Sequence, residues 1–456
     1  MPSLMCRDVA ATSLFVGELL PTPCPVVRGS IPRALRGGAY VRNAPNPQHL
    51  PTETHHISDG DGMLHSLLLA AGGDDTAPTA LCSRYVQTCK YLVEREAGKS
   101  VLSKIFSGMH GVDGLVRRTA VVARVITGQM ELFAAVDLAN TSLAYFGGRL
   151  FALGEPDLPY VDFGGKLSMG MTAHPKKDPI TGEVFAFRCG PVPPFVTHFP
   201  FDADGKKQPD VPIFSVWRPS FLHDFAITEN YAVLCDMQKE MQPLQMVPRV
   251  GILPRYAASD SDIMWFDVPG FNPVHTVNAW EEDGGATVVP VAPNVLSVEH
   301  AQDRMELIRC CVEMVRIELK SGAVSRTPLS AGNLDFGVIN PNYLGRRNRY
   351  AYVGVGGPQP KVAGVVKLDL EKKGGDCVRR RAHLCADAGR GRGGGRRYLV
   401  AFLHDENTRK SSFLVMDARS PDLEVVAEVS LHRRVPYGFH GIFVKAEELR
   451  AQKGEP

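Results

Sequence analysis

Four histidines stand in settings that could hold a metal ion, because each lies at the end or edge of an apolar or aromatic stretch. They are His174, His223, His275 and His440, separated by 49, 52 and 165 residues. Spacing alone does not single them out among the 14 histidines of the chain. Four others have comparable settings: His55, His56, His65 and His404.

The number of imidazoles bears on which metal they could hold. Neutral imidazole suits zinc, iron, copper and nickel. Four histidines would saturate a tetrahedral zinc ion and make the site structural. Around octahedral Fe(II) the same four would leave two positions open, enough for dioxygen. No carboxylate accompanies them in the sequence pattern, so the two-histidine-one-carboxylate arrangement of many iron oxygenases is absent.

The elements that must position these histidines are short and extended, and turn residues separate them. Many short strands at close spacing indicate a closed all-β architecture: a sandwich, a barrel or a propeller. Length favours a propeller, since seven blades would have about 65 residues each where known blades run about 40–50. Spacings near one and three blades would then bring the histidines to the central axis. The expected strands are Ala39–Arg42, Met63–Leu69, Ser83–Glu94, Ser142–Leu153, Glu183–Arg188, Phe225–Cys235, Val312–Leu319, Arg349–Gly354, Val362–Leu370, Tyr398–His404 and Ser412–Asp417.

One segment has a helical pattern. Val101–Met130 is rich in apolar residues, and Arg117, Arg118 and Arg124 interleave with them. The segment could be a helix packed on the β core. It could also be an interfacial helix or patch that enters lipid head groups, with the arginines as anchors.

Composition excludes several classes of protein. The 456 residues carry 51 Lys plus Arg and 49 Asp plus Glu, a net charge of +2, so no general field attracts nucleic acid. No apolar run reaches the length of a membrane-spanning helix. The 10 cysteines include no C-x-x-C pair and fit reduced thiols inside a cell. Residues 1–20 read as an atypical or truncated leader, and residues 21–456 as a single domain.

Glu371–Arg397 differs from the rest of the chain. Its 27 residues include seven glycines and seven arginines and show almost no strand pattern. We expect a flexible loop here rather than a nucleic-acid-binding segment, because no aromatic residue is present to stack on a base.

Several longer motifs then resemble those of the carotenoid oxygenase family, also called the carotenoid cleavage dioxygenases, and within it the plant carotenoid cleavage dioxygenase 4 group. The resemblance runs from about Pro21 to Val444. The motifs that carry it are Arg42–Pro47, Asp59–His65, Ala152–Glu155, Leu158–Tyr160, Met171–Lys176, Asp178–Glu183, Phe221–Asn230, Asn278–Glu282 and Arg434–His440.

The resemblance implies a seven-bladed β-propeller with a helical or loop cap over a non-haem Fe(II) on the axis. It assigns the iron ligands to His174, His223, His275 and His440, and leaves His65 as a structural residue. Such enzymes use dioxygen to cleave one C=C bond of a carotenoid or apocarotenoid into two carbonyl products. The group suggests the 9,10 (9′,10′) bond. It also suggests a plastid location, with docking on a membrane or plastoglobule surface.

Carboxylates that orient the ligand rings are a further family feature, and here the chain departs from the pattern. By motif, Glu155 is one such carboxylate and Asp335 occupies the position of a second. The third belongs to a Gly-Gly-Glu-Pro strand that Glu371–Arg397 replaces, so we expect a weakened or inactive enzyme. Two alternatives therefore stay open: an impaired propeller that binds carotenoid or lipid, and a propeller with structural zinc.

Overall fold

The computed structural model describes residues 16–51, 56–72, 78–102, 137–154, 161, 163–167, 170–220, 222–237, 247–300, 307–357, 361–372, 378–381, 390–391 and 398–453. Within these ranges the regular structure is mostly strand, with helices α1 (Cys89–Ala97) and α3 (Ala446–Arg450) and short 3-10 turns. None of the helices in this part of the chain is both long and apolar enough to cross a membrane.

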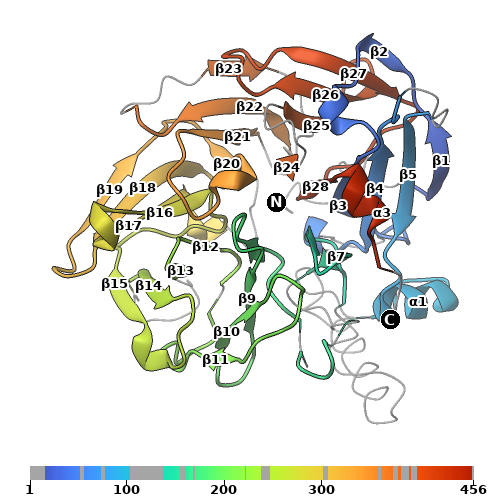
Figure 1. Cartoon of the computed structure of the whole chain (residues 1–456). Helices are drawn as coiled ribbons and strands as arrows, with labels where there is room; N and C mark the ends of the chain where they lie inside the picture. The colour runs from blue at the N-terminus through green and yellow to red at the C-terminus, as the bar shows by residue number, and fades with distance from the viewer. Residues whose placement is uncertain are drawn as a thin grey trace.

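The strands form seven sheets that stand around a common centre, so the fold is the expected seven-bladed β-propeller (Figure 1). Four blades are built from four consecutive strands each, and a fifth sheet is a hairpin of β6 (Ser142–Phe146) and β7 (Arg149–Leu153). The four blades are β8 (Lys176–Lys177), β9 (Val184–Cys189), β10 (Val196–Phe201) and β11 (Val211–Pro212); β12 (Phe225–Ile227), β13 (Tyr231–Asp236), β14 (Arg249–Pro254) and β15 (Met264–Asp267); β16 (Asn278–Glu282), β17 (Thr287–Val295), β18 (Cys310–Glu318) and β19 (Val324–Pro328); and β20 (Leu334–Val338), β21 (Tyr350–Gly356), β22 (Val362–Asp369) and β23 (Val378–Arg381).

The remaining two blades join the two ends of the chain. In one, β2 (Val26–Gly29) adds to β25 (Tyr398–Asp405), β26 (Lys410–Asp417) and β27 (Val425–Leu431). In the other, β28 (Gly441–Val444) pairs with β3 (Ala39–Pro45), followed by β4 (Gly62–Leu68), β5 (Ala80–Tyr85) and β1 (Leu19–Pro23). Two antiparallel pairings between N-terminal and C-terminal strands, β2 with β27 and β3 with β28, therefore close the ring.

Blades pack face to face, and the strand sequences reflect this. All nine residues of β17 are buried. Val288 packs in a cluster with Val233 and Ile252 of the preceding blade, whereas Val289 packs in a cluster with Val353 and Leu368 of the following blade. Successive side chains of a strand point to opposite faces, so a strand between two blades is apolar at nearly every position.

Several expected strands are found, but some are hairpins. Ser142–Leu153, expected as one extended segment, folds as the β6–β7 hairpin, with Gly147 and Gly148 both at positive φ in the turn. Ser83–Glu94 is a wrong prediction, because β5 ends at Tyr85 and α1 follows. The Thr88 hydroxyl caps the first turn of α1, and Gly98 ends the helix in the left-handed conformation. These two caps define a helix that the apolar pattern does not reveal.

Glu371–Arg397 contains strand structure that the sequence does not predict. β23 pairs antiparallel with β22 and completes its blade, and β24 (Arg390–Gly391) pairs parallel with β28. The absence of strand here is therefore a wrong prediction. Strand pairing tolerates an unusual sequence because the neighbouring backbone supplies the hydrogen bonds. Val101–Met130, expected as a helix, lies almost entirely outside the described residues.

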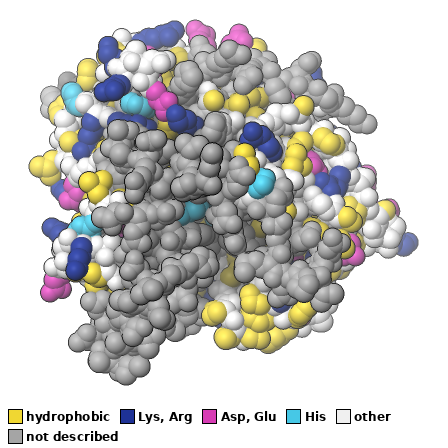
Figure 2. Space-filling model, turned by 180° about the vertical axis from the view of Figure 1, so that it is seen from behind, with side chains coloured by type: hydrophobic (Ala, Val, Ile, Leu, Met, Phe, Trp, Pro, Cys, Tyr) yellow, Lys and Arg dark blue, Asp and Glu magenta, His cyan; other side chains and the backbone are white. Residues whose placement is uncertain are grey.

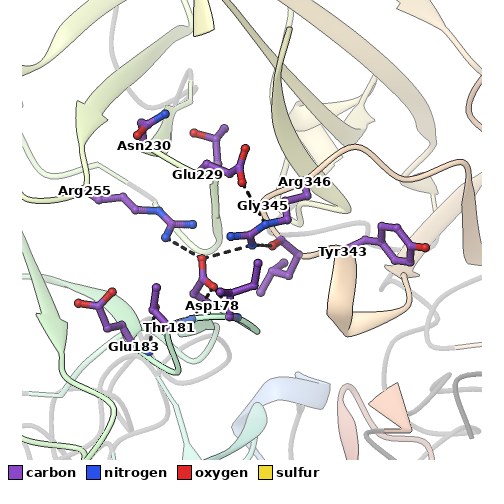
Figure 3. A network of polar contacts seen from close by, with 12 residues as sticks. Asp178, Thr181, Glu183, Glu229, Asn230, Arg255, Tyr343, Gly345 and Arg346 are labelled. Atoms are coloured by element: carbon purple, nitrogen blue, oxygen red, sulfur yellow. Dashed lines mark hydrogen bonds and ion pairs between the residues drawn. The ribbon is translucent and has the colours of Figure 1, made fainter. Parts of the chain in front are cut away.

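A buried carboxylate joins three blades at the ends of their strands (Figure 3). Asp178 follows β8 and is fully buried; its Oδ2 accepts hydrogen bonds from Arg255 at 2.7 Å and from Arg346 at 3.4 Å. The Arg346 side chain also reaches Glu229 at 3.2 Å. Burial disfavours the ionised Asp178, but the Arg255 guanidinium and nearby backbone N–H groups outweigh it and lower the pKa of the carboxyl group below 3.8.

We expect Asp178→Asn to lower the free energy of unfolding by about 3 kcal/mol at pH 7, since it leaves the Arg255 charge buried without its counter-ion. Because the pKa of Asp178 is depressed in the folded state, its contribution is present above pH 3.8 and is lost as the pH falls below that value. Urea unfolding at pH 7 and pH 3 measures both effects. Arg84→Gln, which removes an exposed ion pair with Glu18, should cost less than about 1 kcal/mol. Equal losses for the two variants would contradict the prediction.

Candidate metal centre

Four histidines lie at the starts of four blade strands that approach the centre of the ring. His174 precedes β8, His223 precedes β12, His275 precedes β16 and His440 immediately precedes β28. These strands occupy equivalent places in four blades, so the connections that enter them converge at one end of the axis (Figure 1). The propeller topology thus brings together residues that are as far as 266 positions apart in sequence.

The imidazole rings form one cluster. The Nε2 atoms of His174 and His223 are 3.0 Å apart, and His174, His223 and His275 offer nitrogen atoms within 4.8 Å of one another. His440 adjoins this group, with its ring centroid 4.6 Å from that of His174 and 5.2 Å from that of His275. The ring planes are steeply inclined to one another, at 67° to 89° for the pairs that include His174. Three of the rings thus offer nitrogen atoms to one small region from different blades, with the fourth ring beside them, and this is an arrangement that could hold a metal ion.

Burial favours the neutral form of the His174 ring. His174 is buried, and burial lowers its pKa well below the ordinary 6.5; the neighbouring histidines and Lys176 lower it further. A neutral imidazole keeps a lone pair on one nitrogen, which is the form that binds a metal ion. His174 is therefore in the form that can act as a metal ligand.

Asp335 orients one of the rings. It lies on β20, and its Oδ1 accepts a hydrogen bond from Nδ1 of His275 at 2.9 Å. This contact fixes the proton on Nδ1 and leaves the lone pair of Nε2 free for a metal. Phe336, the next residue, packs its ring 5.1 Å from that of His275 and 5.8 Å from that of His440. Glu155, the other carboxylate expected near the histidines, lies outside the described residues.

The competing histidines take other roles. His65 lies on β4 and His404 on β25, and the Nδ1 of each is 2.9 Å from a serine hydroxyl, that of Ser83 or Ser411. Neither joins the central cluster of described residues. His56 uses Nδ1 to accept a hydrogen bond from the backbone of Ser58. These three histidines therefore make hydrogen bonds away from the central cluster, and His55 lies outside the described residues.

A small cavity adjoins the histidines. Its volume is about 60 Å³, and His174, His275 and His440 line it. Four further polar residues also line it: Ser142, Lys176, Asp224 and Thr276. Sequence reasoning missed these polar residues, although Lys176 and Asp224 stand inside two of the motifs that identify the histidines.

Comparison with known proteins relates the whole chain to one family. The sequence profile described as retinal pigment epithelial membrane protein matches residues 16–445. The chain is similar to the chloroplastic 9-cis-epoxycarotenoid dioxygenase NCED1 of Oryza sativa subsp. japonica, with 58% identity over 99% of this chain and 78% of the relative. It is also similar to the probable chloroplastic carotenoid cleavage dioxygenase 4 of Arabidopsis thaliana, with 50% identity over 95% and 79%.

Two further similarities bear on function and fold. The zeaxanthin 7,8(7′,8′)-cleavage dioxygenase of Crocus sativus is 54% identical over 71% of this chain and 100% of the relative. Among solved structures, the apocarotenoid oxygenase of Synechocystis has a TM-score of 0.74 at 21% identity, covering 96% of this chain and 98% of that structure. The lignostilbene dioxygenase of Pseudomonas brassicacearum has the same TM-score at 22% identity, covering 94% and 95%. The propeller fold is thus shared at low sequence identity.

Metal content tests the cluster directly. Replacing His174, His223, His275 or His440 with Ala should remove most of the bound divalent metal, since three imidazoles no longer enclose the ion. His65→Ala and His404→Ala should leave metal content near that of the unchanged protein. Elemental analysis after loading with Fe(II) and gel filtration under argon measures the ratio of metal to protein. Equal metal loss for His404→Ala and His440→Ala would show that the site lies elsewhere.

Proposed function

The chain belongs to the retinal pigment epithelial membrane protein family, the family of the carotenoid oxygenases, and on this premise we propose that it is a non-haem Fe(II)-dependent dioxygenase. In this proposal it cleaves one C=C bond of a carotenoid or apocarotenoid into two carbonyl products, with both oxygen atoms coming from dioxygen. The observation that carries the proposal is the cluster of His174, His223, His275 and His440 at the end of the propeller axis.

The number of nitrogen donors bears on the choice between iron and zinc. The Nε2 atoms of His174 and His223 are 3.0 Å apart, close enough to bind one ion. Four imidazoles would fill the coordination of tetrahedral zinc. Four nitrogen ligands on an octahedral ion leave two positions for other ligands, so the donor set fits Fe(II). Iron bound there would supply dioxygen chemistry at the polyene.

The protein's own residues contribute position and environment. Asp335 holds the His275 ring in one orientation, and the Phe336 ring packs against two of the histidines. Cleavage of a C=C bond by dioxygen needs no protein acid or base, so orientation of the substrate and exclusion of water are the expected contributions of the chain.

The relatives' names mention different bonds: 7,8 (7′,8′) for the Crocus sativus protein and 9,10 (9′,10′) for a Phaseolus vulgaris protein that is 34% identical. We infer cleavage at the 9,10 (9′,10′) bond from the likeness to the carotenoid cleavage dioxygenase 4 group. The chloroplastic relatives support a plastid location, where carotenoids are made.

Iron-loaded protein incubated with β-carotene, zeaxanthin or an apocarotenal under ¹⁸O₂ should release carbonyl products that carry the label. Mass spectrometry of the products identifies the cleaved bond, since cleavage at 9,10 and at 7,8 gives fragments of different mass. The His275→Ala variant serves as the matched control and should release none. Products from the 7,8 bond would correct the choice of bond, and no product from fully iron-loaded protein would reject the enzymatic proposal.

A second function remains in competition: an impaired propeller that binds carotenoid without cleaving it. The observation that favours it is the unusual Glu371–Arg397 segment beside the blade of β25. Among the described residues, β25 is the last strand of its blade on the side of the axis. The two-residue strand β24 pairs with β28 of the neighbouring sheet instead of extending the blade of β25. Iron occupancy with bound carotenoid but no oxygen consumption would select this function.

A membrane surface is the source of substrate that we propose, because carotenoids barely dissolve in water. Large apolar side chains are exposed near the connection that carries His223: Phe214 is 60% exposed and Trp217 is 63% exposed. Val192 and Val247 are exposed in the loops before β10 and β14, and Ser215 accepts a hydrogen bond from Arg249 of β14. Figure 2 shows hydrophobic side chains gathered at the lower right of one face. Such side chains suit contact with acyl chains or a plastoglobule coat.

Replacing Phe214 and Trp217 together with Ser should reduce flotation with liposomes of plastid lipid composition at least several-fold, because two large apolar groups no longer enter the lipid. Both side chains are exposed, so folding should be unaffected. Leu20→Ser with Val27→Ser, two exposed residues of the N-terminal strands, is the matched control and should float normally. Unchanged flotation of a folded Phe214→Ser/Trp217→Ser protein would remove this surface from consideration.

A further inference from the structure

A buried ion pair lies directly beside the histidine cluster. The Lys176 ammonium is 2.6 Å from Oδ1 of Asp224, and the two side chains are only 2% and 3% exposed. Lys176 is two residues from His174, and Asp224 follows His223. The pair therefore links the start of β8 to the start of β12, next to the histidine that precedes each strand.

Asp224 also reaches a third strand. Its Oδ2 accepts a hydrogen bond from the backbone N–H of Thr276 at 2.8 Å and lies 2.9 Å from the Thr276 hydroxyl. Thr276 follows His275. The other oxygen, Oδ1, accepts from the backbone N–H of Phe225 at 2.7 Å. One buried carboxylate thus has partners on three blades, each within two residues of a different histidine of the cluster.

A second contact repeats the pattern between two of these blades. The buried Thr172 hydroxyl accepts a hydrogen bond from the backbone N–H of His174 at 3.1 Å and donates to the backbone carbonyl of His223 at 3.2 Å. The Thr172 contacts and the ion pair therefore connect the same two segments, the one that carries His174 and the one that carries His223.

Burying two charged side chains costs free energy, which points to a role for the pair beyond stability. A buried ion pair often adds no stability over apolar residues of the same size, but it fixes geometry. A lysine beside a site for a divalent cation would also repel the ion. The carboxylate of Asp224, 2.6 Å from the Lys176 ammonium, offsets this repulsion. Geometry and charge together give the pair a role at the metal site.

We propose that Asp224, with Lys176 and Thr276, is a positioning residue that holds the His174, His223 and His275 segments at metal-binding spacing. The inference rests on the proposed function, because it takes the histidine cluster to be a metal site. It predicts that the binding of metal depends on residues that do not touch the metal.

Cobalt(II) is the probe for the test, because its visible absorption bands report both affinity and coordination geometry. Asp224→Asn keeps the shape of the side chain but removes its charge, and should weaken Co(II) binding about 10–100-fold, as loss of groups that orient metal ligands commonly does. Its Co(II) bands should also shift, since the ligands are no longer held at their spacing. Thr276→Val removes only the hydroxyl and should weaken binding by a smaller factor.

Asp61→Asn is the matched control. Asp61 forms a buried ion pair with Lys90 at 3.0 Å, with side-chain exposures of 4% and 5%, in a part of the structure that shares no described contact with the histidines. Both Asn variants should lower the melting temperature of the metal-free protein. Only Asp224→Asn should change the affinity for Co(II) and its spectrum.

The outcomes separate this inference from the proposed function. Failure of the unchanged protein to bind Co(II) would overturn both. Normal Co(II) binding by the unchanged protein, with the same affinity and spectrum in Asp224→Asn, would overturn the positioning role alone. Should Asp224→Asn fail to fold, the double variant Lys176→Met/Asp224→Met replaces the ion pair with apolar chains. Weakened Co(II) binding in the folded double variant supports the role, and unchanged binding overturns it.

Discussion

The pairing of β28 with β3 is the constraint on which the candidate centre depends. β28 begins at Gly441, one residue after His440, and its ladder is formed with a strand that lies some 400 residues earlier in the chain. The backbone N–H of Asn43 also donates to the carbonyl of His440 at 3.0 Å. The His440 ring can meet His174 only when the ring of blades is closed. The metal site is therefore a property of the completed propeller and not of any single blade.

Burial has a different consequence at the centre than in the blades. Between blades it is favourable, since strands such as β17 are apolar on both faces. At the axis the inner strands carry His, Lys, Asp and Thr, and each buried polar group needs a partner. Asp224 meets that need with a lysine, a threonine and two backbone groups, and Asp335 meets it with His275. Those partners come from adjacent blades, so polar contacts at the axis set the relative position of blades that apolar packing alone leaves less sharply defined.

The sequence predicts what depends on local pattern and on recognisable motifs. The apolar pattern of Ser142–Leu153 identifies an extended segment, and the motifs around His174, His223, His275 and His440 identify the residues that converge. It fails where long-range contacts decide. α1 depends on a Thr88 cap that its apolar pattern does not show, and β23 forms because β22 offers it a partner. The Asp224 network requires knowing that β8, β12 and β16 are neighbours at the axis, which spacing cannot establish before the fold is known.

The polar axis also constrains how a carotenoid could reach the histidines. The cavity beside the histidines is small, about 60 Å³, and Lys176, Asp224 and Thr276 line it. A long hydrocarbon placed there would strip these groups of their partners, which is costly. The connection from β11 to β12 carries the exposed Phe214 and Trp217 and then His223, so apolar surface and candidate ligand belong to the same end of the blades. Under the proposed function, a substrate taken from lipid at that end would enter on the same side of the blades as the imidazoles, which would let one molecule combine an apolar substrate with a polar metal site.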